Sequence, residues 1–171
     1  MKDTNKKQPS LFGDVMFLLA KISFIVLTFV IIFTWIYGAF RNDEYGMTPA
    51  INQGDLIIYY RLDKNYLSND VIAIKENGVN QTRRVIATEG DTVDIKENGL
   101  YVNGYLQTES KIYFDTKRFE EGIDFPVTIG PGEVFVLGDN REKARDSRLY
   151  GPISVDDTLG KVMMVFRIRD I

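Results

Sequence analysis

The longest apolar segment of the chain lies near its N-terminus, where Ile22 to Phe40 contains no charged residue. As a helix, these roughly 19 residues span about 28 Å, which is enough to cross the hydrocarbon core of a bilayer. Lys21 precedes the run, and Trp35 and Tyr37 lie near its end. Basic residues favour the cytoplasmic side of a membrane, and aromatic residues gather at its interfaces. We therefore expect a single-pass helix over residues 22–40 in the plasma membrane, with residues 1–21 as the cytoplasmic tail and anchor start.

A cleaved leader is the alternative interpretation of this run. The segment is long for the apolar part of a leader, and the bulky Tyr37 precedes Ala39, where a cleavage site would need a small residue. We therefore expect an uncleaved anchor that holds the C-terminal part of the chain outside the cell.

Beyond the anchor, the pattern changes to short stretches of β-branched and aromatic residues separated by Gly and Asn, which is typical of strands. We expect strands over residues 56–61, 71–75, 81–87, 92–96, 99–102, 127–129, 133–137 and 161–168. Asn-Gly pairs suit hairpin turns because both residues tolerate positive φ, and such pairs occur at 77–78, 98–99 and 103–104. One short helical turn is expected at Val155 to Leu159, with Ser154 as its cap. The body of the protein is therefore expected to be mainly β.

Composition excludes several classes of site. With no Cys and no His, the chain has no means to form disulfides, thiol nucleophiles, or Ser-His and Cys-His pairs, and it lacks the usual zinc ligands. A hydrolase of this composition would need another base, and Lys is the usual substitute. The net charge is −3, from 21 basic and 24 acidic residues, and does not favour nucleic acid as a partner. We expect neither a metal nor a cofactor.

Three stretches after the anchor hold candidates for chemistry. Tyr45 to Ala50 reads, taken alone, as a turn that leads into the first strand. Arg83 and Arg84 are neighbours on an alternating strand, so one of them should point inward, where it would form an ion pair or serve a function. Gly138 to Gly151 begins with a turn and continues as a loop in which an Asp and an Arg, at positions 146 and 148, could pair.

Together these stretches resemble type I signal peptidases, the membrane-anchored serine proteases that cut leader peptides from exported proteins. The elements come in the same order: anchor, a Met-x-Pro box at 47–49, Gly-Asp at 54–55, an Arg-Val-Ile box ending in Gly-Asp at 84–91, and Gly-Asp-Asn-Arg at 138–141 closed by Asp-Ser-Arg at 146–148. The resemblance implies antiparallel sheets around a peptide groove. It divides the body into a β core, residues 41–96 and 127–171, and a small inserted cap, residues 97–126.

The resemblance also implies a Ser nucleophile, a neutral Lys base and hydroxyls that support them, and all of these are replaced. Gly46 occupies the nucleophile position and Ala144 the position that orients the Lys. Arg83 occupies the base position, although a guanidinium does not lose its proton in proteins. Glu44 replaces a residue beside the oxyanion, which a carboxylate would repel. Losing a nucleophile and its base typically costs on the order of 10⁶ in turnover, so we expect the chain not to be an enzyme. We further expect Arg83 and Glu44 to meet across the site.

The remaining family positions fall into two groups. The resemblance places the peptide groove at Tyr45, Gly46, Met47, Gln81, Thr82 and Arg83. It assigns a bracing role to Pro49, Asp139, Asn140, Arg141, Asp146, Ser147 and Arg148.

Three functions are compatible with these features. The chain resembles most closely the signal-peptidase-like proteins of pilus assembly in Gram-positive bacteria, which implies an inactive relative that holds exported precursors or pilin subunits, in partnership with sortase. The alternative is an active peptidase with a relocated nucleophile at Tyr45, Thr48 or Ser147 and Lys143 as its base. The third is a structural subunit that binds an active signal peptidase through the anchor or the cap.

Overall fold

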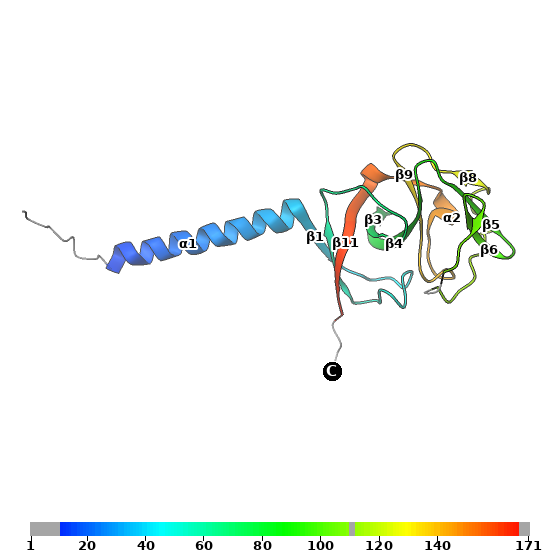
Figure 1. Ribbon diagram of the computed structural model, residues 1–171. Coiled ribbons are helices and arrows are strands. Elements are labelled where there is room, and N and C mark those ends of the chain that lie inside the picture. The colour runs from blue at the N-terminus through cyan, green and yellow to red at the C-terminus, as the bar shows by residue number, and fades with distance from the viewer. Residues whose placement is uncertain (1–10, 110–111, 168–171) are drawn as a thin grey trace, which may run out of the picture. The chain divides into compact units, whose positions relative to one another are not determined.

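The computed structural model describes residues 11–109 and 112–167, and the chain divides into one unit that ends at Ile36 and one that begins at Tyr37. In the first unit, helix α1 spans Leu11–Ile31 and continues into the π-helical turn η1, Ile32–Ile36 (Figure 1). Together they are long and apolar enough to cross a membrane.

The bounds of this helix differ from the expected membrane run of residues 22–40. The helix begins earlier, because Asp14 and Lys21 are compatible with a helix even though they interrupt the apolar pattern. It ends earlier because Tyr37 to Arg41 finds a strand partner and forms β1. Residues 1–10 of the expected cytoplasmic tail lie outside the described residues.

The second unit consists of two antiparallel sheets, which confirms the expected mainly β fold. The larger sheet has the strand order β1-β2-β11-β3-β4-β9-β10. Its strands are β1 Tyr37–Arg41, β2 Leu56–Tyr60, β3 Val71–Glu76, β4 Val79–Thr88, β9 Glu133–Leu137, β10 Ile153–Ser154 and β11 Thr158–Phe166. The smaller sheet has the order β7-β6-β5-β8, formed by β7 Tyr105–Leu106, β6 Gly99–Val102, β5 Thr92–Lys96 and β8 Val127–Thr128.

Each expected strand overlaps an observed one, and three observed strands were not expected. β7 and β10 have two residues each, too few for any pattern. β1 was hidden because its apolar residues continue the anchor. The hairpin turns at 77–78 and 103–104 are confirmed, with positive φ at both residues of each pair. At the third pair the turn lies one residue earlier, because Gly99 already begins β6.

Two short helical turns complete the body. The turn η2, Val155–Asp157, is capped by the Ser154 hydroxyl as expected. Helix α2, Ser147–Tyr150, lies in a segment expected to be a loop, and Asp146 is its N-cap. Its carboxylate accepts a hydrogen bond from the backbone N–H of Arg148, which explains why the helix begins here.

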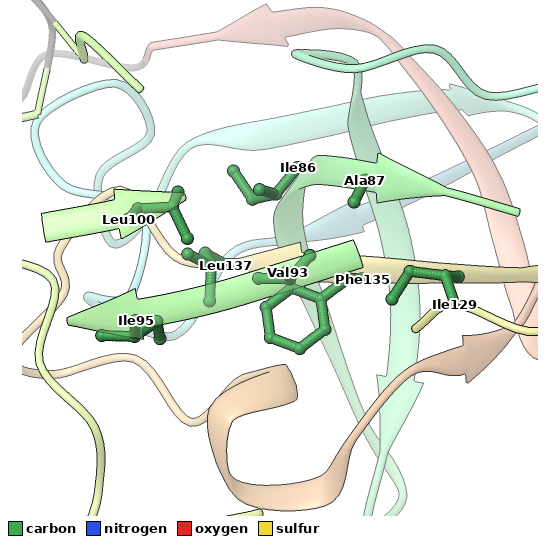
Figure 2. Close-up of a cluster of buried hydrophobic side chains, with 8 residues drawn as sticks. All are labelled: Ile86, Ala87, Val93, Ile95, Leu100, Ile129, Phe135 and Leu137. Atoms are coloured by element: carbon green, nitrogen blue, oxygen red, sulfur yellow. The ribbon is translucent and has the colours of Figure 1, made fainter. Parts of the chain in front are cut away.

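The main hydrophobic cluster joins the two sheets (Figure 2). Ile86 and Ala87 of β4 and Phe135 and Leu137 of β9 pack against four residues from or near the smaller sheet, namely Val93, Ile95, Leu100 and Ile129. This packing changes the expected division into core and cap. Strands β5 and β8, expected in the core, form one sheet with β6 and β7, expected in the cap, because their alternating apolar residues share this cluster.

A second cluster positions the loop between β1 and β2. Met47 and Ile51 of this loop are buried with Ile57 of β2, and Phe40 and Val162 pack against them. The loop is therefore held against the large sheet by its own apolar residues.

Candidate functional site

The site begins with Asn42, which fixes the loop between β1 and β2. The Asn42 backbone N–H donates to the Asp55 carbonyl at 2.8 Å, and the Asn42 side-chain amide donates to the carbonyl oxygens of Glu44 and Asn52 at 2.9 and 3.0 Å. Asn42 is fully buried. The backbone at Glu44 is therefore held in place by an internal hydrogen bond, although it belongs to no helix or strand.

The structure brings together the four positions that the resemblance assigned to catalysis. A Cβ atom added at Gly46 would lie 3.1 Å from Arg83 Nη1, 3.2 Å from Glu44 Oε2 and 3.3 Å from Ala144 Cβ. The Gly46 carbonyl accepts a hydrogen bond of 2.9 Å from the backbone N–H of Asn140. Four positions spread over about one hundred residues of sequence thus share one location in the fold.

The expected contact between Arg83 and Glu44 is confirmed. Arg83 Nη2 lies 3.0 Å from Glu44 Oε2, and Nη1 pairs with Oε1 of the same carboxylate. The Arg83 side chain is completely buried, whereas 22% of the Glu44 side chain is exposed. The guanidinium is planar and presents a fork of donors, which suits this two-point contact with a carboxylate.

The other hydrogen bonds of Arg83 go to the main chain and to one amide. Nε and Nη2 donate to the carbonyl oxygen of Arg145 at 3.1 and 2.9 Å, Nη1 donates to the carbonyl of Thr82 at 2.6 Å, and Nη2 donates to Gln81 Oε1 at 2.7 Å. Every nitrogen of the group has a partner. Arg83 therefore connects the Glu44 loop, strand β4 and the loop before α2.

Tyr150 belongs to the surroundings of this pair, although no role was predicted for it. Burial raises the pKa of its phenol, and the charge of Arg83 acts in the opposite direction. The charges of Asp146, Glu76 and Glu44 also raise this pKa. Its buried hydroxyl has no hydrogen-bond partner among the residues that the structure describes. A phenol at the end of a loop is too common to mark a site in a sequence.

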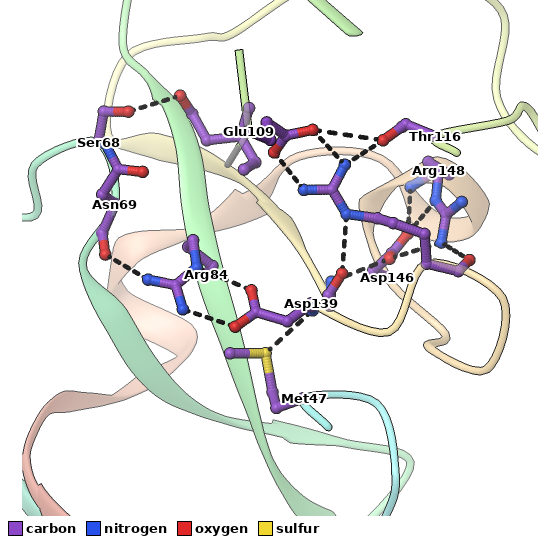
Figure 3. A network of polar contacts seen from close by, with 12 residues as sticks. Met47, Ser68, Asn69, Arg84, Glu109, Thr116, Asp139, Asp146 and Arg148 are labelled. Carbon is purple, nitrogen blue, oxygen red and sulfur yellow. Dashed lines mark hydrogen bonds and ion pairs between the residues drawn. The ribbon is translucent and has the colours of Figure 1, made fainter. Parts of the chain in front are cut away.

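The loop that carries Ala144 is held by a buried ion pair (Figure 3). Arg148 Nε donates to Asp146 Oδ1 at 2.8 Å, as expected from the sequence, and both side chains are buried. Arg148 Nη2 also donates to the Arg141 carbonyl at 2.6 Å, and Asp146 Oδ2 accepts from the Gly138 backbone N–H at 3.1 Å. The pair therefore closes the loop from residue 138 to residue 148.

Two further arginines connect this loop to the rest of the body, and Figure 3 shows the first of them, Arg84, beside Asp139. Arg84 donates from Nε and Nη2 to the Asp139 carboxylate at 2.7 and 2.6 Å, and Arg141 forms a two-point pair with Glu109. The Met47 sulfur accepts from the Asp139 backbone N–H at 3.4 Å. Arg83 and Arg84 thus serve opposite sides of β4, as their alternation predicts.

The structure shows the surroundings of three further positions that the sequence analysis named. The Ser147 hydroxyl is buried and accepts from the Val136 backbone N–H at 3.0 Å. Met47, expected to line the groove, lies in the core beneath the loop. Pro49 follows a cis peptide bond with Thr48 in this loop.

The hydroxyls of Tyr45 and Thr48 lie on the loop between β1 and β2, and the amine of Lys143 lies near Tyr45 on the loop that carries Ala144. Tyr45 is 52% exposed, and its hydroxyl bonds to Gln53. The Lys143 ammonium lies 5.5 Å from the centre of the Tyr45 ring. The Thr48 hydroxyl donates to the Tyr45 carbonyl at 2.9 Å.

Strand β4 has a segment with one unpaired edge. It pairs with β3 from Val79 to Arg84, and it pairs with β9 only from Arg84 onward. On the β9 side, residues 79–83 have no strand partner within the described part of the chain. The predicted groove residues Gln81 to Arg83 lie on this segment. An extended peptide can bind to such an edge through its backbone.

Metal ligation finds no support in this geometry. Across residues 11–109 and 112–167, no group of three or more acidic side chains is arranged to hold a metal ion.

Comparison with known proteins matches residues 15–167 to the family described as signal peptidase, peptidase S26. A signal peptidase I of Bacillus licheniformis is 31% identical over 86% of this chain and 82% of its own length. A signal peptidase IB of Staphylococcus aureus is 33% identical over 83% of this chain and 85% of its own length. A crystal structure of a signal peptidase I from Enterococcus faecalis V583 is 28% identical, covering 58% of this chain and 97% of that chain, with a TM-score of 0.48.

These relatives overturn the expectation that the chain is not an enzyme. That expectation rested on four replaced side chains, whereas the similarity to proteins named as signal peptidases extends over more than four fifths of the sequence and points to a peptidase. The replacements change which groups are available for the reaction, and they leave the family assignment intact. Over residues 15–167, the chain belongs to the signal peptidase family, peptidase S26.

Proposed function

We propose that the chain is a membrane-anchored endopeptidase that acts on exported precursor proteins. The observation that carries the proposal is the family match over residues 15–167, which includes both the apolar helix and the two sheets. Holding the body on a membrane raises its effective concentration near precursors that cross the same membrane.

The open edge of β4 supports the binding of an extended peptide. Val79 to Gln81 are exposed or half-buried on the segment that β9 does not cover, whereas Thr82 and Arg83 are buried, so a peptide would pair with residues 79–81. Pairing along this edge would run a substrate past Gly46 and the Arg83–Glu44 pair, because both lie at the end of the unpaired segment.

The reaction needs a hydroxyl at a position other than 46, because Gly has no side chain. Ser147 is unsuitable, since it is buried and its hydroxyl is bound to the Val136 N–H. Thr48 and Tyr45 are the two candidate hydroxyls that remain in the loop. Lys143, beside the Tyr45 ring, is the candidate base, because an ammonium can lose its proton and a guanidinium cannot.

The proposal is tested with the full-length chain in detergent micelles and a purified exported precursor, and the products are identified by mass spectrometry. We expect cleavage at one bond. Either Thr48→Ala or Tyr45→Phe should lose this activity, depending on which hydroxyl is the nucleophile, and Thr128→Ala should retain it. Thr128 is a matched control because its hydroxyl is exposed on the smaller sheet.

A companion variant makes a negative result informative. Gly46→Ser with Arg83→Lys and Ala144→Ser supplies the side chains that the family resemblance implies. If this variant cuts the precursor and the native chain does not, the native peptidase proposal is refuted, and the peptide groove is nevertheless formed.

Pilin subunits and a sortase form the narrower part of the proposal. They follow from the resemblance of the sequence to proteins of Gram-positive pilus assembly. The substrate set should therefore contain a pilin precursor beside an unrelated secreted precursor. Equal cleavage of both would argue against pilins as a preferred substrate.

The orientation in the membrane is also proposed, with the N-terminus cytoplasmic and the β body outside the cell. The chain contains no Cys, so single Cys residues can be introduced without background. In intact cells, a membrane-impermeant maleimide should label Thr128→Cys and leave Thr4→Cys unlabelled. The reverse labelling pattern would refute this orientation.

A further inference from the structure

We propose that Arg83 is a binding site for peptide carboxylates, and that Glu44 is an internal ligand which such a carboxylate displaces. This inference rests on the proposed function, because it names a ligand of the same site. Its first support is the asymmetry of the pair, in which Arg83 is fully buried on a strand and Glu44 is partly exposed on an irregular loop.

The guanidinium has contacts that do not depend on Glu44. The Arg145 carbonyl binds Nε and Nη2, the Thr82 carbonyl binds Nη1, and Gln81 binds Nη2. These contacts would keep the donor fork in place after the carboxylate left. In contrast, every side-chain hydrogen bond that the structure gives Glu44 goes to Arg83. Glu44 is therefore the partner that can leave.

A carboxylate is the ligand class that this arrangement selects. A buried guanidinium without a counter-ion is strongly unfavourable, so loss of Glu44 requires another anion in its place. The fork geometry binds both oxygens of a carboxylate at once. Tyr150 contributes a second observation. Its buried hydroxyl has no hydrogen-bond partner among the described residues. The charges of Arg83 and Glu44 both affect the pKa of this phenol.

The surroundings indicate that the carboxylate belongs to an extended peptide. The unpaired edge of β4 ends at Arg83, and a peptide that pairs with its accessible residues, 79–81, would bring a terminal group toward the guanidinium. A Cβ at position 46 would lie 3.2 Å from Glu44 Oε2, so departure of Glu44 would open space there for a small residue next to the carboxylate. The carboxylate is either the free C-terminus of the peptide or an acidic side chain.

A free C-terminus connects this site to hydrolysis. Cutting a peptide bond with water creates a carboxylate on the upstream fragment and an amine on the downstream fragment. An intact precursor has an uncharged amide at that point. Arg83 would therefore favour the upstream product over the uncut chain, and Glu44 would limit how long the product stays bound.

Binding of labelled hexapeptides to the full-length chain in micelles tests the inference by fluorescence anisotropy. Three peptides share one sequence: the first ends in Ala with a free carboxylate, the second ends in an amide, and the third ends in an amide but carries one internal Glu. The variants are Glu44→Ala, Arg83→Lys and, as a matched control, Arg118→Lys, whose pair with Asp94 lies on the smaller sheet.

We expect Glu44→Ala to bind the free-acid peptide about tenfold more tightly than the native chain does, since it removes an internal competitor. The amide peptide should not gain affinity. Arg83→Lys keeps the charge but loses the fork, and should reduce the preference for the acid over the amide, whereas Arg118→Lys should keep it. Tight binding of the third peptide would identify an acidic side chain as the carboxylate source.

Equal affinities of Glu44→Ala for acid, amide and Glu-containing peptides would overturn the inference. Near-UV circular dichroism of each variant verifies that its fold is intact, and the Glu44→Ala comparison stands even if Arg83→Lys does not fold. Peptide binding is measured separately from cleavage, so failure of carboxylate binding leaves precursor cleavage to be judged by its own assay.

Discussion

Replacing Arg148 by Met is expected to destabilise the loop that carries Ala144 more than any exposed ion pair would. Arg148 neutralises the buried carboxylate of Asp146 through Nε and Nη2, at 2.8 and 2.9 Å. It also satisfies the carbonyl oxygens of Arg141 and Lys117 at 2.6 and 3.0 Å. Met fills a similar volume, so the change removes charge and hydrogen bonds with little loss of packing.

The magnitude follows from the burial of both partners. The Asp146 side chain is 0% exposed and that of Arg148 is 1% exposed. Removing one member of a buried pair leaves an uncompensated charge, which costs about 3–5 kcal/mol. Asp146 would keep hydrogen bonds from the backbone N–H groups of Gly138 and residue 148, so the lower half of this range applies. For a body of this size, the loss corresponds to a melting temperature lower by roughly 10 °C.

Thermal unfolding of the full-length chain in micelles, followed by near-UV circular dichroism, measures this effect. Lys96→Met is the matched control, because the pair of Lys96 with Asp94 is long, at 3.7 Å, and half of the Lys96 side chain is exposed. Exposed pairs contribute about 1 kcal/mol or less. If Arg148→Met lowers the melting temperature no further than Lys96→Met does, the buried pair does not brace the loop.

Three further outcomes follow from named contacts. Gly138→Ala should lower stability by about 1–3 kcal/mol or more, because its Cβ would lie 2.1 Å from Ala144 Cβ and 2.5 Å from the Gly46 carbonyl oxygen. Gly46→Ala should change stability by less than about 1 kcal/mol, because its contacts of 3.1 to 3.3 Å involve only side-chain atoms; both changes are measured by the same melting assay. The Thr88 backbone N–H lowers the pKa of Asp91, against the effect of burial. The stabilising contribution of the Asp91 carboxylate is therefore complete above the unfolded-state pKa of about 3.9. It is lost as the pH falls through the lower folded-state pKa. Asp91→Asn should accordingly be destabilising at pH 7 and show less further loss below pH 4, and equal acid sensitivity of both proteins would contradict this assignment.

The sequence predicted the fold where local pattern and packing agree. Strands such as β3 and β9 combine apolar alternation with flanking turns, so they were found with nearly their observed bounds. The end of the membrane run was not found, because Tyr37 to Phe40 carries no charge and so continues the uncharged run, and this segment becomes a strand only by pairing with β2. The division between core and cap also depended on long-range packing that local composition does not show.

The candidate site was predictable where chemistry limited the choice of partner. The family resemblance placed positions 83 and 44 at one cavity, and a buried Arg needs an anion, so the contact of Arg83 with Glu44 was a sound expectation. Tyr150 and the Arg145 carbonyl were missed, since a backbone carbonyl has no sequence identity and a phenol is compatible with many environments. The absence of a Ser and a Lys at two positions was a poor guide to enzyme class, because relationship over a whole chain is broader evidence than four side chains.

The four replaced positions depend on one another physically. The Arg83 guanidinium is larger than an ammonium, and its Nη1 lies 3.1 Å from where a Cβ at position 46 would be. Small residues at positions 46 and 144 leave room for it, and Glu44 supplies the charge that its burial requires. A Ser introduced at position 46 alone would therefore meet an occupied space and a base position that does not release a proton. For this reason a reversion at position 46 alone is a weak test of the site, and the joint change at positions 46, 83 and 144 is the stronger one, because it removes the guanidinium and supplies the hydroxyls and the Lys together.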